Sequence, residues 1–208
     1  ALVSIGGVGF SPEAPITFKS GIQSPVYCDN RRFPFHPKEW SKVVLGFQAL
    51  LGKLEAVPEV IAGIEAAGIP HSAALGYASG TPSVFVRKEA KGYGAKKRVE
   101  GGDVAGKQVV LIEDLVTTGI SSLSGVAALR AEGAVVTDCL AIISYGMKEA
   151  TQSFAEAGVV LHTLTDFHEV LGVAVEEHKL REAQADVIRD WLRDPHGWAD
   201  RNASEGRS

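Results

Sequence analysis

Short apolar segments alternate with helical patterns through the middle of the chain, and this alternation constrains the fold more than any other feature. Four segments read as buried strands: residues 57–62, 83–87, 109–112 and 135–144. Helical patterns cover residues 69–79 and 122–132 between them. Strands joined by helices pair in parallel. The sequence therefore predicts an α/β fold with a central, mainly parallel sheet flanked by helices.

The rest of the chain fits one domain spanning residues 1–208. Further helical patterns cover residues 40–54 and 175–192, and residues 159–164 read as a late strand. Residues 194–208 turn polar, with Pro, Gly and Asn, so we expect a flexible tail there. Whether a further helix comes before the first residue stays open.

Composition and charge narrow the class of protein. The 208 residues are 45% hydrophobic and 22% charged, enough to bury a real core. No apolar run approaches the ~20 residues that span a bilayer, and the start lacks the features of a signal peptide. The net charge of −4 gives no general footprint for nucleic acid. The two cysteines, Cys28 and Cys139, do not have the spacing of metal ligands, and the six histidines do not either. This disfavours a zinc enzyme. Together these features favour a cytoplasmic location.

The strand at residues 109–112 is expected to end at two carboxylates, Glu113 and Asp114, before a hydroxyl-rich loop at residues 117–121. At the carboxyl end of a parallel strand, such a loop and the next helix direct N–H groups at one point, which suits a phosphate. Two carboxylates would repel that phosphate unless they faced a ribose diol or a phosphate-bound Mg²⁺. The segment therefore predicts a sugar phosphate site. The alternative is an acidic strand end followed by an ordinary turn with a helix N-cap.

Two further segments offer groups for a phosphorylated ligand. Residues 63–68 begin and end in glycine directly after a strand, so their N–H groups can approach a pyrophosphate; a plain glycine-bounded turn is the alternative. Residues 87–98 concentrate cations in an otherwise acidic chain, although a charge run is more often a solvated hairpin. Cations on a closing loop would stabilise a departing pyrophosphate and exclude water.

Residues 17–29 combine Lys19 and the turn residues Ser20 and Gly21 with an aromatic side chain, Tyr27. A lysine beside glycine in a turn is usually just exposed. A cation and an aromatic ring around a turn could equally cover a flat anionic ring by stacking and hydrogen bonding.

In this order, the segments resemble the type I phosphoribosyltransferases, and among them the members that use orotate. The resemblance runs from about Leu2 to Leu171. Its most discriminating motifs are Phe18-Lys19-Ser20-Gly21 with Ser24-Pro25-x-Tyr27, and Arg87-Lys88-x-x-Lys91-x-Tyr93-Gly94 with Val99-Glu100-Gly101. It implies a type I fold in which residues 1–40 contribute a small N-terminal hood over the base site.

The resemblance also implies a reaction. The 5-phosphoribosyl group of phosphoribosyl pyrophosphate (PRPP) would pass to orotate, giving orotidine 5′-monophosphate and pyrophosphate in pyrimidine synthesis. Lys19, Lys91 and Asp114 would be catalytic, and Mg²⁺ would be held mainly through PRPP, near Asp114, rather than by a protein metal site. Substrate binding would fall to Ser20, Tyr27, Arg87, Lys88, Tyr93, Lys96, Glu113, Thr117, Thr118, Gly119 and Ser121. The basic loop would close over the partner's site in a homodimer, with no nucleic-acid or membrane partner.

Two departures from the family pattern leave questions open. Tyr93 stands where some members have His, so imidazole acid–base chemistry would be missing there. Residues 144–148 contain no Arg where some members place a base-reading Arg, and Lys148 is a candidate to replace it. The competing hypotheses are a phosphoribosyltransferase for another base and a PRPP-sensing regulator. The regulator would need a DNA-binding domain or a strongly basic face, and the sequence shows neither.

Overall fold

The centre of the structure, a computed structural model that describes residues 1–18, 20–89 and 97–205, is a six-stranded sheet. Its strands are β5 Val60–Ile64, β6 Ser83–Val86, β7 Val99–Glu100, β8 Gln108–Val116, β9 Val135–Ser144 and β10 Val160–Asp166. They lie in the order β10-β9-β8-β5-β6-β7, and only the pair β6–β7 at one edge is antiparallel. The predicted α/β class with a mainly parallel sheet is confirmed.

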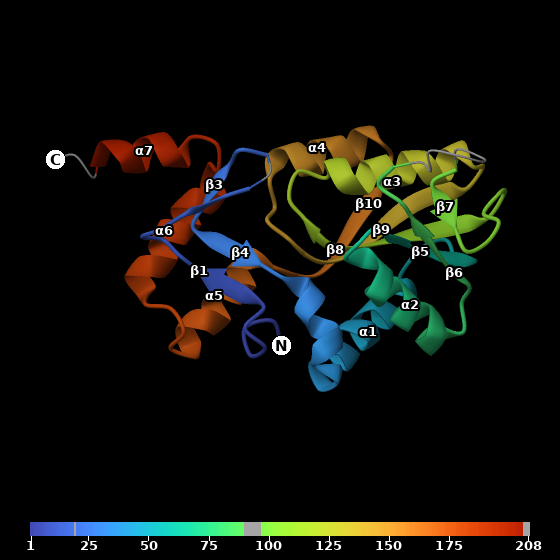
Figure 1. Ribbon diagram of the computed structural model, residues 1–208, viewed down its shortest axis with the longest axis horizontal. Coiled ribbons are helices and arrows are strands. Elements are labelled where there is room, and N and C mark those ends of the chain that lie inside the picture. Colours follow the sequence, from blue (N-terminus) through green and yellow to red (C-terminus); the bar gives the residue numbers. More distant parts are fainter. Residues whose placement is uncertain (19, 90–96, 206–208) are drawn as a thin grey trace.

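Helices cover both faces of the sheet (Figure 1). One layer holds α1 Pro37–Leu51 and α2 Gly68–Ser79, and the other holds α3 Ile120–Ala131 and α4 Lys148–Glu156. Because successive side chains of a strand point to opposite faces, Val110 and Ile112 pack with the first layer and Leu111 with the second. Burial on both faces explains why these strands read as continuous apolar runs.

A smaller unit built from both ends of the chain covers one end of the sheet (Figure 1). Its N-terminal part has two antiparallel strand pairs: β1 Val8–Phe10 with β4 Val26–Cys28, and β2 Ile16–Thr17 with β3 Gln23–Ser24. Helices α5 Phe167–Glu176 and α6 Glu182–Arg193 supply the rest. The hood is therefore not formed by residues 1–40 alone, because Trp191 of α6 is fully buried and donates a 2.8 Å hydrogen bond to the Gln23 carbonyl.

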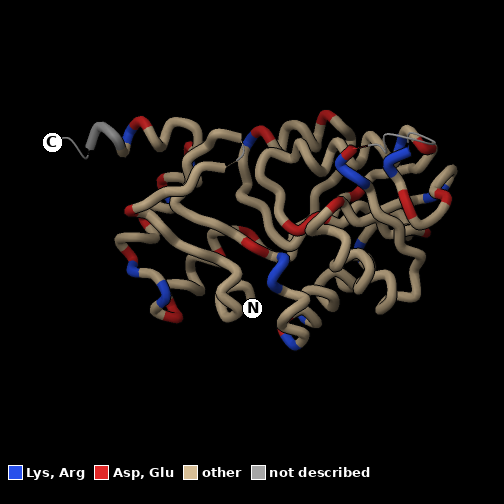
Figure 2. Tube along the Cα trace, viewed as in Figure 1, with Lys and Arg blue, Asp and Glu red and all other residues tan. Residues whose placement is uncertain are grey.

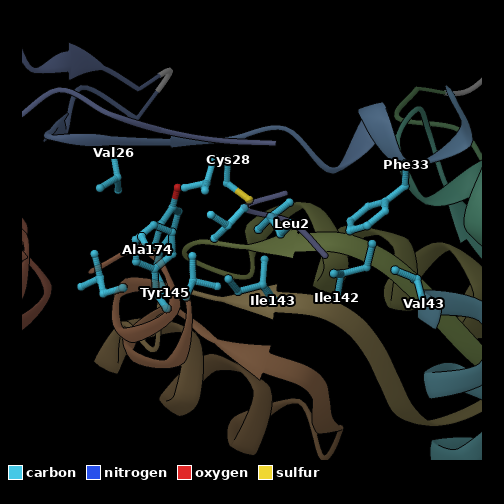
Figure 3. Close-up of a cluster of buried hydrophobic side chains, with 14 of the residues drawn as sticks. Leu2, Val26, Cys28, Phe33, Val43, Ile142, Ile143, Tyr145 and Ala174 are labelled. Carbon is cyan, nitrogen blue, oxygen red and sulfur yellow. The ribbon is translucent and has the colours of Figure 1, made fainter. Parts of the chain in front are cut away.

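Apolar side chains join the hood to the sheet (Figure 3). Tyr145 lies at the centre, with ring centroids 5.0 Å from Phe167, 5.3 Å from Trp191 and 5.9 Å from Phe18. A short 3-10 helix, η1 Asn30–Phe35, then leads from β4 to α1. Both cysteines are buried and free, which confirms the interpretation of Cys139 as a small buried hydrophobe.

Three expectations about element boundaries are wrong. Strand β8 does not end at residue 112 but continues through both acids to Val116, because β9 pairs with it as far as Ser144. The pattern at residues 175–192 is divided between α5 and α6 rather than forming one helix. Part of the expected tail forms helix α7 Trp198–Glu205, since Trp198 is buried at 2% exposure.

Candidate active site

The carboxyl end of β8 and the hood enclose a cavity of about 580 Å³. Phe18 and Ser20 line it from the hood, Lys88 and Arg98 from the ends of β6 and β7, and residues 115–122 from below. A strand's carboxyl end in a parallel sheet is where ligands of α/β proteins collect. This is the region in which the sequence predicted a sugar phosphate site.

The loop after β8 has the geometry of a phosphate site. Thr117, Thr118, Gly119 and Ser121, the residues predicted to cradle a phosphate, all line the cavity. Gly119 adopts φ +82° directly before α3, and a Cβ there would lie 3.0 Å from the Phe154 ring. Because the first turn of a helix leaves its N–H groups unpaired and carries a partial positive charge, an anion is stabilised at this point.

The two acids beside the loop lie in a poorly solvated place. Glu113 is 5% exposed; the Ser122 hydroxyl donates to its Oε2 at 3.2 Å and the Asp114 N–H donates to its Oε1 at 3.1 Å. Burial, with the neighbouring Asp114 charge, raises the pKa of Glu113 well above its usual 4.5. Burial also raises the pKa of Asp114, although the Arg31 guanidinium opposes this shift. Such a pair favours a ligand that brings a cation or hydroxyl groups.

The hood contributes two residues that the sequence predictions missed. Arg31 donates from Nη2 to the Tyr27 hydroxyl at 2.7 Å and from Nε to Asp29 at 2.6 Å, and Asp29 raises the pKa of Arg31. Asn30 is completely buried and donates to the main-chain carbonyl of Asp114 at 2.9 Å. Both directly follow the Ser24-Pro25-x-Tyr27 motif, so their position in the chain was the available signal.

The basic segment is only partly described. Lys88 reaches the cavity, whereas Arg87 is turned toward Glu100 of β7, with Nη1 at 3.3 Å from the carboxylate. Figure 2 shows acidic and basic segments around this edge of the sheet. The remaining predicted residues Lys19, Lys91, Tyr93 and Lys96 lie outside the described residues.

The glycine-bounded segment at residues 63–68 has a packing role. A Cβ at Gly63 would collide with the Ser72 hydroxyl, and one at Gly68 with the Ile112 carbonyl, so both glycines allow α2 to approach the strands. Glu65 faces a neighbour, because its carboxylate accepts the Lys88 N–H at 2.9 Å. Of this segment, only Ile64 lines the cavity.

Lys148 does not lie at this cavity. It lines a separate depression between the start of α4 and the end of α6, beside Glu149 and His196. Tyr145, from the same stretch, is buried in the hood contact. The structure therefore gives Lys148 no place as a base-reading residue.

The described residues provide neither a metal-binding cluster of three or more side chains nor a membrane-spanning helix. Residues 1–18, 20–89 and 97–205 contain no group of three or more His, Cys, Asp or Glu side chains that could hold a metal ion. Within the same ranges, every helix is too short or too polar to cross a membrane.

Curated proteins and solved structures resemble this chain over most of its length, although no family model matches it. Orotate phosphoribosyltransferase from Coxiella burnetii is 35% identical over 197 residues, covering 95% of this chain and 94% of that protein. The same enzyme from Staphylococcus saprophyticus is 38% identical over 191 residues, with 92% and 94% covered.

Two solved structures share the fold. Orotate phosphoribosyltransferase from Aeropyrum pernix has a TM-score of 0.73 and 28% identity, covering 86% of this chain and 96% of that one. UMP synthase from Leishmania donovani has a TM-score of 0.81 and 27% identity, covering 92% of this chain and 40% of that one. The loop after β8, the hood and this extent of similarity lead to one conclusion: the chain belongs to the orotate phosphoribosyltransferase family.

Proposed function

We propose that the protein transfers the 5-phosphoribosyl group from PRPP to orotate and releases pyrophosphate. One observation carries this proposal: the loop at residues 117–121 lines one cavity with Phe18 and Ser20 of the hood, and the acids Glu113 and Asp114 precede this stretch on strand β8. Curated relatives that are 35% and 38% identical carry the name of this activity.

In this proposal the loop binds the 5′-phosphate, and Asp114, with Glu113 behind it, receives the ribose hydroxyls. Lys88 lies where it would meet the pyrophosphate, and we assign the same task to Arg87, Lys91 and Lys96 of the basic segment, with Tyr93 beside them.

The base would lie under the hood between Phe18, Ser20 and Tyr27, with Lys19 near both base and pyrophosphate.

The chemistry needs no covalent bond to the protein. The bond from ribose C1 to the pyrophosphate oxygen breaks, and a ring nitrogen of orotate forms the new bond to C1 from the opposite face. The proton on that nitrogen leaves to the departing pyrophosphate or to water. Catalysis then consists of positioning and of electrostatic stabilisation of the departing pyrophosphate.

The donor set fits Mg²⁺ held through PRPP. Glu113 and Asp114 offer hard carboxylate oxygens. Burial and then the neighbouring Asp114 charge raise the pKa of Glu113, and a cation would relieve the repulsion between the two acids. When bound with PRPP, Mg²⁺ would neutralise charge on the pyrophosphate.

We also propose a cytoplasmic homodimer. Phe35, Leu45 and Tyr77 are 86%, 63% and 94% exposed on the adjoining elements η1, α1 and α2, and large exposed apolar groups of this kind favour a second copy. In such a dimer Lys88 would serve the site of its own subunit, and Lys91 of the same segment would serve the site of the other.

The substrate is tested by incubating the protein with PRPP, Mg²⁺ and orotate and following the loss of orotate absorbance, with uracil and hypoxanthine in parallel. We expect turnover of orotate alone, its loss in Lys91→Ala, and wild-type turnover in the matched exposed-lysine variant Lys53→Ala. Turnover of another base would contradict the assignment of the base. Binding of PRPP without turnover of any base would favour the sensor.

The shared site is tested by mixing two inactive variants, Asp114→Asn and Lys91→Ala. If each site takes its loop from the partner, mixed dimers contain one site with both native residues, so activity returns to about a quarter of wild type after subunit exchange. No recovery, with mixed dimers verified by mass, would contradict loop sharing.

A further inference from the structure

The side chain of Asn30 links the hood connection to the strand that carries the acids. It is 0% exposed, and its Nδ2 donates to the Asp114 carbonyl, 84 residues away, at 2.9 Å. Only the nitrogen end of an amide can donate, so this contact fixes the orientation of the side chain. Its Oδ1 is buried without a hydrogen-bond partner in the described part of the chain. Burying an amide with one unpaired end costs free energy. The hydrogen bond that its other end donates to Asp114 is therefore the contribution that this side chain makes.

The Asp114 peptide needs a side-chain hydrogen-bond partner because strand β8 is paired on only one side at this position. Pairing between β5 and β8 ends at Gly63 and Ile112, whereas β9 stays paired with β8 as far as Val116. Beyond Ile112, β8 therefore has a neighbour on one side only. Side chains supply partners for Asp114: Glu113 accepts its N–H at 3.1 Å, and Asn30 donates to its carbonyl. These two contacts hold the Asp114 peptide directly before the residues of β8 that line the cavity.

Side chains of α1, α2 and η1 pack around the segment that carries Asn30. Trp40 of α1 donates to His71 Nδ1 at 3.0 Å, so the neutral ring of His71 carries its proton on Nε2. The His71 ring is 0% exposed and burial lowers its pKa to about 4, a shift that the nearby Asn30 main chain opposes. Its Nε2 has no hydrogen-bond partner in the described part of the chain. The Phe33 ring packs edge-on against it at 6.4 Å. The start of η1 is thus fixed against α1 and α2.

We propose that Asn30 is a positioning residue for the reaction: its amide sets the place of the Asp114 carboxylate, and the packing of Phe33 against His71 holds the short helix η1 that carries Asn30. This rests on the proposed function, in which Asp114 receives the ribose hydroxyls of PRPP. Removing the amide leaves the Asp114 carbonyl without a partner and lets the carboxylate move out of register with the ribose.

The test compares Asn30→Ala and Asn30→Asp with Gln48→Ala, a control that removes a different α1–α2 link, from Gln48 to the Ala78 carbonyl. Affinity for PRPP with Mg²⁺ is measured by calorimetry from about pH 6 to about pH 8.5. We expect Asn30→Ala to bind about tenfold more weakly and the control to stay within about twofold of wild type.

Asn30→Asp separates positioning from packing. A buried carboxyl group near Asp114 has a raised pKa, and when protonated its O–H can donate to the Asp114 carbonyl. Its PRPP affinity should therefore recover as the pH falls, whereas that of Asn30→Ala should not. If Asn30→Ala fails to fold, the pH profile of Asn30→Asp is compared with that of the wild type instead.

Wild-type affinity in Asn30→Ala would overturn the inference, as would an Asn30→Asp pH profile that shows no recovery relative to wild type. A wild-type protein that binds PRPP but transfers it to no base would count against the proposed function alone, because the binding comparison would still stand.

Discussion

Glu113 lies where a carboxylate is unfavourable. In the unfolded chain its pKa is near 4.5, but burial and Asp114 raise the folded-state pKa well above that value. The folded protein therefore holds more protons on this residue. Proton binding by Glu113 therefore contributes to the free energy of unfolding. This contribution is fully present below the unfolded-state pKa of Glu113 and is lost as the pH rises through its folded-state pKa.

The variant Glu113→Gln removes this titration. Above about pH 4.5 the free energy of unfolding of the wild type should fall with pH relative to that of the variant. Urea denaturation of both proteins without ligands between about pH 5 and about pH 8 measures the difference. If the free energies of unfolding of the two proteins change with pH in the same way, titration of Glu113 does not contribute to the pH dependence of stability.

Gly119 carries two constraints, a positive φ and the nearby Phe154 ring. We expect Gly119→Ala to lose stability by about 1–2 kcal/mol and to bind PRPP much more weakly, because the loop must move. Gly80→Ala is the matched control, since Gly80 has φ +68° with open space around it at the end of α2. Thermal denaturation and PRPP titration of both variants check this. Equal PRPP affinities in the two would show that the loop backbone does not matter for binding.

At the scale of elements, Glu132 ties strand β7 to helix α3. Its Oε1 accepts the N–H groups of Arg98 and Val99 at 3.1 and 3.0 Å. The Arg98 side chain adds a bond from Nη1 to the Ser124 carbonyl at 3.1 Å. The C-terminal end of the basic segment is therefore anchored on α3, the helix that follows the loop at residues 117–121.

Glu132→Ala removes the acceptor for two N–H groups, so we expect a loss of about 1–3 kcal/mol in the free energy of unfolding. Glu132→Gln keeps one carbonyl acceptor and should lose less. Chemical denaturation measures both. A loss in Glu132→Ala no larger than in Glu132→Gln would mean that the two N–H groups find water or other partners.

Elements were predictable where one physical signal dominated. The apolar run at residues 109–112 identified β8, but its extension through Glu113 and Asp114 was missed, because acids normally end a strand. Here β9 continues the pairing and Ser122 donates to Glu113, and both partners are distant in sequence from the run itself. The phosphate loop was predicted because all its residues are consecutive.

At the scale of the whole molecule, the hood closes only when the two ends of the chain meet. Trp191 lies 168 residues from Gln23, whose carbonyl accepts its indole N–H, and its ring packs edge-on against Phe18 and Tyr145. Local patterns at residues 1–40 and 175–192 could not reveal this pairing. Contacts between distant parts of the chain also explain why the sequence offered Lys148 as a candidate and did not reveal the contact of Asn30 with Asp114.

Trp191→Phe keeps a ring but leaves the Gln23 carbonyl without its donor, so we expect a loss of about 1–3 kcal/mol and a larger rise in KM for orotate than for PRPP. Trp198→Phe is the matched control, because the indole nitrogen of Trp198 has no hydrogen-bond partner in the described part of the chain. Thermal denaturation of both variants measures the loss of stability, and steady-state kinetics measures the KM values for orotate and PRPP. Equal rises in the two KM values would mean that α6 does not shape the base site.

The most direct test of the account is to identify the products of the wild-type protein by phosphorus NMR, with PRPP and Mg²⁺ in the presence and absence of orotate. We predict equal amounts of pyrophosphate and orotidine 5′-monophosphate with orotate, and neither above the uncatalysed background without it. Pyrophosphate release that does not depend on orotate, or the absence of the nucleotide, would contradict the claim that this cavity transfers a phosphoribosyl group to orotate.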